Sequence, residues 1–463
     1  MVKLLWHEQA LPHSNTDMKY LIFTFFVVFG LFHKISSSEF WPITISRTWL
    51  HPDRFETSMF QKPLLTFFLA FFHLLNVSDV AHLIIVKFFF SLFTAVGLFS
   101  FSYFVLRFHD SKKKPDLTSV AVLSLLFFIC APTFQENFFS VRSDQAAFVL
   151  FVLFLNLCQS GFIRLSALCL LIIPLMGIKE SLFLLPGALY YASQFNHLLT
   201  KRVLFYGCLF SAAVLIWAFA LNLDALNYLG NTYEEATFSR FASPTFISES
   251  TLLAGALISW IYFFSKKNKR MYPLCGVSMP LALALFLIPQ SFDFFVASLI
   301  PFIYLPLILM LLQTLPEKKL LALTTAQVLF VIATRYTFDI QFYQTNLTQL
   351  KFISKISDVV HRNKLTYLDG IGILPKQTYL PCFVSPLDAM ANNYCISLLK
   401  EKKPDVVIIT NRLLGLGDQI FQLVQNGYTQ LYPNFYVLNE YVTDEMKKQQ
   451  DLSDKNGVPV FIF

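Results

Sequence analysis

Apolar runs that approach the length of a membrane-spanning helix recur along the first 335 residues, separated by short polar segments. An α-helix needs about 20 mostly apolar residues to cross a bilayer. The candidate segments are Tyr20–Ile35, Ala81–Phe108, Leu117–Pro132, Asp144–Ser160, Arg164–Met176, Ile178–Ser193, Val203–Leu223, Thr251–Ser265, Met271–Ile288, Phe294–Leu315 and Leu320–Thr334. This pattern predicts an α-helical polytopic membrane protein with about eleven transmembrane helices.

One further apolar run, Leu64–Leu75, is too short to cross a bilayer and suits a helix lying in the membrane interface. When this run is left out and the N-terminus is placed in the cytoplasm, almost all Lys/Arg clusters fall in cytoplasmic loops, including Lys112–Lys114 and Lys266–Arg270. The residues before Tyr20 are too polar for a cleavable signal, so Tyr20–Ile35 is expected to remain as a helix. Residues 36–75 then form the first outer loop and its interfacial helix.

Beyond Arg335 the long apolar runs give way to short elements of mixed type. An amphipathic helix is predicted over Asn346–Arg362, followed by strands at Leu365–Leu368, Asp405–Thr410, Tyr428–Leu438 and Pro459–Phe463 and helices at Pro386–Lys400 and Asp418–Asn426. Alternating strands and helices indicate an α/β fold. We therefore expect a transmembrane domain over residues 1–335 and a C-terminal extracytoplasmic α/β domain over residues 336–463.

Composition agrees with this class of protein. Hydrophobic residues make up 55% of the chain and charged residues 14%, whereas a soluble domain carries about 25% charged residues. The net charge of +7 comes largely from basic clusters between apolar segments, where they orient a membrane protein, so nucleic-acid binding is rejected. No cysteine or histidine spacing matches a zinc site, and Cys382 and Cys395 are candidates for a disulfide in an extracytoplasmic tail.

The first outer loop concentrates candidate chemistry. Glu39 begins the loop, where a carboxylate at the lipid–water boundary would act as a general base towards an acceptor. Lys62 lies where the interfacial run opens, and its ammonium would neutralise a lipid-linked phosphate. The structural alternatives are a solvated helix-end carboxylate for Glu39 and a snorkelling side chain for Lys62. The loop also contains three further candidate contacts, Arg47, His51 and Asp53.

Two other charged pairs interrupt apolar sequence. Arg142 and Asp144 lie at the outer start of a predicted span, where charges are costly unless they are paired or face water. They are either a helix-end ion pair or a second carboxylate beside a phosphate-binding arginine. Lys179 and Glu180 fall between two spans with almost no loop. They are either a mutually satisfied pair, or Lys179 binds a phosphate and Glu180 is a candidate acceptor or loop contact. Arg240 lies in a long predicted loop, residues 224–249, that is a candidate lid or acceptor contact.

Taken in order, these residues resemble motifs of the C-type glycosyltransferases, in particular the group of protein O-mannosyltransferases and lipid A aminoarabinose transferases. Glu39 resembles the acidic residue after the family's first span, although Phe40 replaces a second acid. Lys62-Pro63-Leu64 is similar to a Lys-Pro-Pro-Leu motif with one proline missing. Arg142-Ser143-Asp144 and Ile178-Lys179-Glu180 resemble two further family motifs, each close to the start of a span.

The resemblance implies an integral membrane enzyme that moves a sugar from a polyprenyl-phosphate donor to a lipid, glycan or protein acceptor on the non-cytoplasmic side. Glu39 and Asp144 would be the catalytic residues, with Asp144 supporting the loop, and Lys62, Arg142 and Lys179 would contact the donor phosphate. Family members differ in their use of a divalent metal, and the sequence shows no ligand set that decides it. Two other classes remain open: a transporter or flippase of lipid-linked saccharide, and a non-catalytic membrane assembly protein.

Overall fold

The computed structural model describes most of the chain, and the described part is mostly helical. The described residues are 14–33, 35, 37–50, 63–110, 112–131, 134, 139–177, 184, 187–192, 194, 205, 244–287, 299–335, 340–370, 372–375, 396–397, 400–410, 413, 418–432, 434–444 and 446–447. The helices outside the C-terminal part are α2 (Ser14–Phe32), α3 (Ser37–Ile45), η1 (Ser46–Trp49), α4 (Pro63–His73), α5 (Asp79–His109), α6 (Leu117–Cys130), α8 (Ser143–Gln159), α9 (Ile163–Met176), α13 (Pro244–Ser265), α14 (Tyr272–Leu287), α16 (Ile300–Thr314) and α17 (Glu317–Arg335).

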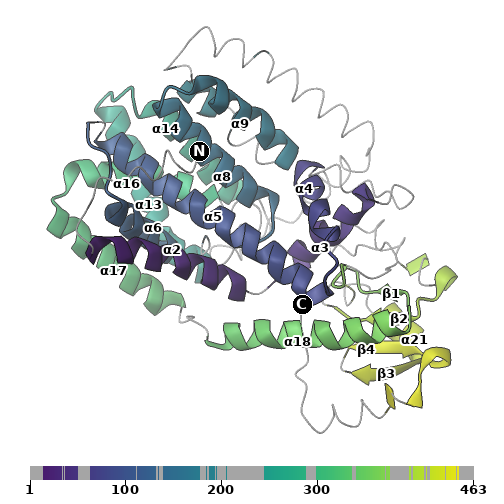
Figure 1. The fold of residues 1–463 in the computed structure, drawn as a ribbon. Coiled ribbons are helices and arrows are strands. Elements are labelled where there is room, and N and C mark those ends of the chain that lie inside the picture. The colour runs from purple at the N-terminus through teal and green to yellow at the C-terminus, as the bar shows by residue number, and fades with distance from the viewer. Residues whose placement is uncertain are drawn as a thin grey trace.

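Helix α5 runs along the length of this bundle and packs against α2, α6, α8 and α16 (Figure 1). It is 31 residues long, and among the described helices it is the one that is both long and apolar enough to cross a membrane. Eight shorter apolar helices accompany it in the described part of the chain. Its first turn is capped by Ser78, whose hydroxyl accepts a hydrogen bond from the Ala81 backbone N–H.

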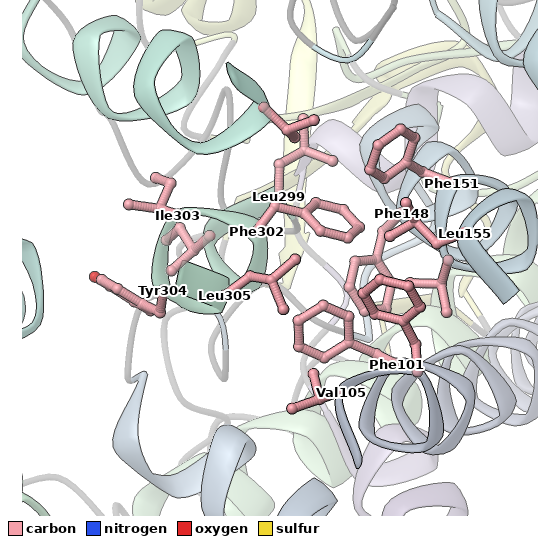
Figure 2. Close-up of a cluster of buried hydrophobic side chains, with 14 of the residues drawn as sticks. Phe101, Val105, Phe148, Phe151, Leu155, Leu299, Phe302, Ile303, Tyr304 and Leu305 are labelled. Carbon is pink, nitrogen blue, oxygen red and sulfur yellow. The ribbon is translucent and has the colours of Figure 1, made fainter. Parts of the chain in front are cut away.

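Aromatic side chains make up much of the bundle interior, in keeping with the 53 Phe residues of the whole chain. Figure 2 shows Phe302 of α16 pointing toward Phe101 of α5 and toward Phe148 and Phe151 of α8, with ring centroids 5.5, 5.4 and 4.8 Å away. Edge-to-face and tilted contacts at these distances are favourable geometries for aromatic pairs. We call this region, with the buried residues of α2, α6, α13 and α14 that join it, the bundle core.

The C-terminal part forms a four-stranded sheet at one end of the bundle (Figure 1). Its strands are β1 (Tyr367–Leu368), β2 (Val406–Ile408), β3 (Tyr428–Tyr432) and β4 (Phe435–Leu438), in the order β1-β2-β4-β3. β1 and β2 are parallel, and β4 is antiparallel to both β2 and β3. Helix α18 (Ile340–Arg362) extends from the bundle towards the sheet, and α21 (Asp418–Gln425) precedes β3.

Two segments that the sequence analysis placed in loops between spans are helical in the structure. Residues 37–49 of the first outer loop form helix α3 and the 3-10 turn η1, and residues 244–249 of the expected long loop belong to α13. Pro42 lies inside α3. Neither segment contains the long apolar run on which the helix predictions rest, so the sequence pattern did not predict a helix there.

Candidate functional site

A second buried cluster joins α3 and α4 to the C-terminal sheet. We call it the junction core. It contains apolar side chains of α3, α4, the first turns of α5, α18 and the sheet, such as Phe40, Leu69, Val86, Ile353 and Phe435. The C-terminal sheet is therefore packed directly on the segment that the sequence identified as its richest in candidate chemistry.

Neighbours of all four candidate motifs meet in this junction core. Phe40 follows Glu39, Leu65 comes shortly after Lys62, and Val141 precedes Arg142, and all three are buried members of the cluster. Met176, which comes shortly before Lys179, is partly buried against the same cluster. Segments that are far apart in the sequence are thus held by one set of apolar contacts.

Arg142 and Asp144 form an ion pair at the start of α8. The Arg142 Nε lies 3.1 Å from Asp144 Oδ1, and both side chains are almost completely buried. The Arg142 carbonyl accepts the Ala146 N–H in the first turn of α8, so the pair is fixed to the helix start. The structure therefore contains the helix-end ion pair that was one of the two interpretations of the sequence.

Helix α5 brings a lysine to the same turn. Lys87 is 2% exposed, and its Nζ donates a hydrogen bond of 2.8 Å to the carbonyl oxygen of Phe139. Phe139 lies three residues before Arg142, in the buried turn that leads into α8. Gly30 of α2 packs closely against the Phe139 ring, because a Cβ at Gly30 would lie 2.5 Å from a carbon of that ring.

Helix α5 carries two more buried polar residues nearer its start, Asp79 and His82. The Ser357 hydroxyl of α18 donates a short hydrogen bond to Asp79, which links α18 to α5. The His82 ring lies 4.5 Å, centroid to centroid, from that of His73 on α4. His73 Nε2 is in turn 2.7 Å from the Ile43 carbonyl oxygen of α3. Hydrogen bonds and ring contacts therefore tie α3, α4, α5 and α18 together at this end.

Sequence reasoning missed Lys87, Asp79 and His82. Each lies within or beside the single apolar run Ala81–Phe108. The available signal was the lysine itself, because an ionisable residue inside a predicted span is a functional-site candidate by default.

Arg47 is one of the predicted contact residues that the structure describes. It lies in η1, and its Nη1 donates a hydrogen bond of 3.4 Å to the Pro375 carbonyl oxygen. Nearby, the Thr44 hydroxyl of α3 donates a hydrogen bond to the Gly372 carbonyl oxygen. The loop after β1 therefore covers the helix that carries Glu39.

That loop is itself internally braced. The Asp369 carboxylate accepts hydrogen bonds from the backbone N–H groups of Gly372 and Ile373, at 2.7 and 2.6 Å. The Thr410 hydroxyl, at the end of β2, donates to the Asp369 carbonyl oxygen at 2.6 Å. Parallel β1 and β2 thus direct their carboxyl ends at α3 and η1.

Several predicted site residues lie outside what the structure describes. Glu39 is placed by its backbone in α3, but its side chain is not described. The others are His51, Asp53, Lys62, Lys179, Glu180 and Arg240, together with Cys382 and Cys395. Within the described residues, no group of three or more His, Cys, Asp or Glu side chains is arranged to hold a metal ion.

The arrangement brings the Arg142–Asp144 ion pair, a buried lysine and α4 together with the segment that bears Glu39. Buried charged side chains need a partner, and the structure gives Arg142 and Asp144 each other and gives Lys87 a hydrogen bond to the Phe139 carbonyl oxygen. Comparisons with protein-family models, with curated proteins and with solved structures find no match to this chain.

Proposed function

We propose that this protein is an integral membrane glycosyltransferase that moves a sugar from a polyprenyl-phosphate donor to an acceptor on the non-cytoplasmic side of the membrane. The observation that carries the proposal is that neighbours of all four candidate motifs share the junction core. Motifs that act on one substrate need one location, and the apolar contacts of Phe40, Leu65, Val141 and Met176 supply it.

The multi-pass membrane location is supported by where apolar side chains are exposed. Large apolar residues with more than a third of their surface exposed occur on α2, α4, α5, α6, α9, α13, α14 and α17. On α5 these include Phe88 at 40% and Phe89 at 45%. A soluble monomer rarely exposes contiguous apolar surface beyond a few hundred Å², whereas lipid-facing helices require it. About eleven spans remain our proposal for the full chain.

The proposed orientation is supported by the basic residues at the opposite end of the bundle from the sheet. Arg107, near the end of α5, donates to the Ser160 hydroxyl after α8 at 2.7 Å. Arg270, before α14, donates to the Phe108 carbonyl oxygen. Basic residues concentrate on the cytoplasmic side of membrane proteins. The junction core and the C-terminal domain, residues 336–463, would then lie outside.

Helix α4 has the two-faced character of an interfacial helix. Leu65 and Leu69 are buried in the junction core, while Phe67, Phe68 and Phe71 are 45–53% exposed. An apolar face of this kind enters the boundary between headgroups and acyl chains. Such a helix would guide a long polyprenyl chain past the site while its phosphate stays at the surface.

The proposed reaction is a displacement at the anomeric carbon of the donor sugar. Glu39 takes the proton of the acceptor as its oxygen or nitrogen attacks, and the bond from the anomeric carbon to the phosphate oxygen breaks. Lys62, Arg142 and Lys179 stabilise the charge that accumulates on the departing polyprenyl phosphate. Asp144 orients Arg142 through their ion pair. A single displacement inverts the anomeric configuration.

The test is a screen of short-chain polyprenyl-phosphate sugars with the purified protein in lipid, measuring sugar transfer and release of polyprenyl phosphate. Loss of a general base lowers the rate by about 10²–10⁴-fold, so Glu39→Gln should nearly abolish transfer. The exposed carboxylate of Glu440 offers a matched control, and Glu440→Gln should leave the rate unchanged. Equal rates in wild type and Glu39→Gln would reject this mechanism. Movement of intact donor across the membrane without transfer would indicate a flippase.

A further inference from the structure

Lys87 is a buried lysine of α5 to which the proposed reaction assigns no role. It lies nine residues into α5 and is 2% exposed, on the same buried face as Asp79 and Ser91. Placing an ammonium in an apolar bundle is costly, and such residues persist where their charge or hydrogen bonds are needed. Lys87 makes its described hydrogen bond to the Phe139 backbone, outside its own helix.

The turn that Lys87 holds leads directly to the ion pair. The Arg142 N–H donates to the Ser140 carbonyl oxygen at 3.1 Å, and the Arg142 carbonyl accepts the Ala146 N–H at 3.3 Å. Phe139, Ser140 and Arg142 are all buried. The position of the Arg142 guanidinium therefore depends on a short backbone path that begins at the carbonyl bound by Lys87.

We propose that Lys87 is a positioning residue, which fixes the Phe139–Arg142 turn so that the Arg142–Asp144 pair is held at the start of α8. The inference rests on the proposed function, because the pair's purpose there is to hold the donor phosphate. An ammonium suits this task, since it donates a charge-assisted hydrogen bond of 2.8 Å to the Phe139 carbonyl oxygen.

Three variants of the full-length protein in lipid test this role. Lys87→Met removes the donor and keeps much of the side-chain volume, and Lys87→Arg keeps a cationic donor. Thr94→Val is the matched control, because the buried Thr94 hydroxyl bonds only to the Phe90 and Ser91 carbonyl oxygens of α5 itself among the hydrogen bonds described. The first measurement is hydrogen–deuterium exchange at the Arg142 and Ala146 amides.

We expect Lys87→Met to speed exchange at these two amides by about tenfold or more while α14 and α16 exchange as in wild type. The second measurement is sugar transfer, where we expect kcat/KM for the donor to fall on the order of 10–100-fold, mainly through kcat, because Arg142 acts on charge that accumulates in the transition state and a displacement of about 1 Å can cost that much in rate. Lys87→Arg should recover both, and Thr94→Val should change neither.

Three results would overturn the inference: exchange at Arg142 and Ala146 unchanged in Lys87→Met, exchange accelerated throughout the bundle, or a loosened turn with an unaltered kcat/KM for the donor. The exchange measurement also separates this inference from the proposed function. If wild-type protein transfers no sugar from any donor, the proposed reaction fails, while local loosening in Lys87→Met would still support Lys87 as the residue that positions the pair.

Discussion

The bundle core and the junction core are both tightly buried, but the polar side chains buried around them are of different kinds. In the bundle core the buried polar groups are chiefly hydroxyls that bond along their own helix or to the next one, as Ser102 and Ser124 do. The junction end instead buries ionisable side chains, those of Asp79, Lys87, Arg142 and Asp144. A scaffold needs only the first kind, and this is why we place the proposed chemistry at the junction end.

The largest effects should come from one substitution in each core. Phe302→Ala opens a cavity between α5, α8 and α16, and Asp144→Ala leaves the buried Arg142 without its carboxylate. Each should lower the free energy of unfolding by about 3–5 kcal/mol, measured by thermal unfolding in detergent. Only the stability lost in Asp144→Ala should be restored by a second substitution. The double variant Arg142→Met/Asp144→Leu should regain stability without regaining sugar transfer. Recovery of sugar transfer would show that the ion pair is not part of the site.

Gly372→Ala should have an intermediate effect confined to the junction. Gly372 has a φ of +75°, and an added Cβ would lie 2.7 Å from Thr44 Cβ on α3. The left-handed backbone alone costs about 1–2 kcal/mol, and the contact must also displace α3. We expect a loss of about 2 kcal/mol in unfolding free energy and a clear fall in transfer, because α3 carries Glu39. An unchanged melting temperature would show that the loop after β1 does not press on α3.

Asp116→Ala should have a smaller effect, at the other end of the bundle. Asp116 caps α6 by accepting hydrogen bonds from the Thr118 and Ser119 N–H groups at 2.8 and 3.0 Å. Loss of such a cap costs about 1 kcal/mol. Partial burial opposes ionisation, but the hydrogen bonds from Ser119 and Thr118 outweigh it and lower the pKa of Asp116. The cap's contribution is therefore present at neutral pH and fades as the pH falls through that lowered pKa. Transfer at neutral pH should persist.

The smallest effect should appear only in alkali. The Tyr428 hydroxyl donates to the Pro404 carbonyl oxygen at 2.7 Å, and burial, with the nearby Asp405, raises the pKa of Tyr428 to about 12. A raised pKa means that the folded state holds this proton more tightly. Stability from this group is complete below about pH 10 and is lost as the pH rises towards 12. Tyr428→Phe should flatten that part of the pH–stability curve, and a wild-type curve already flat there would contradict the assignment.

Much of the helical scaffold could be predicted from the sequence. The predicted segments Ala81–Phe108, Leu117–Pro132 and Asp144–Ser160 end within two residues of α5, α6 and α8. Long apolar runs with clear polar ends leave few alternatives to a helix. Helix α3 was not predictable in this way, because its residues have no helical period and its fold depends on α4 and on the loop after β1.

The candidate site was predictable only in part. Arg142 and Asp144 drew notice because two charges stand at the start of an apolar run, and the structure pairs them. Lys87 was overlooked because its meaning depends on Phe139, 52 residues away, and a sequence pattern does not report that contact. The burial of Phe40, Leu65 and Val141 in one cluster is likewise a tertiary fact, since no local pattern links three distant segments.

The most direct test of the account is to map where a polyprenyl-phosphate donor binds. A donor analogue with a photoreactive group beside its phosphate would be cross-linked to the protein in lipid, and the labelled peptides identified by mass spectrometry. The account predicts labelling of the segments around α3, α4 and the start of α8, removed by excess natural donor. Labelling confined to helices around the bundle core, or labelling that excess donor does not reduce, would contradict it.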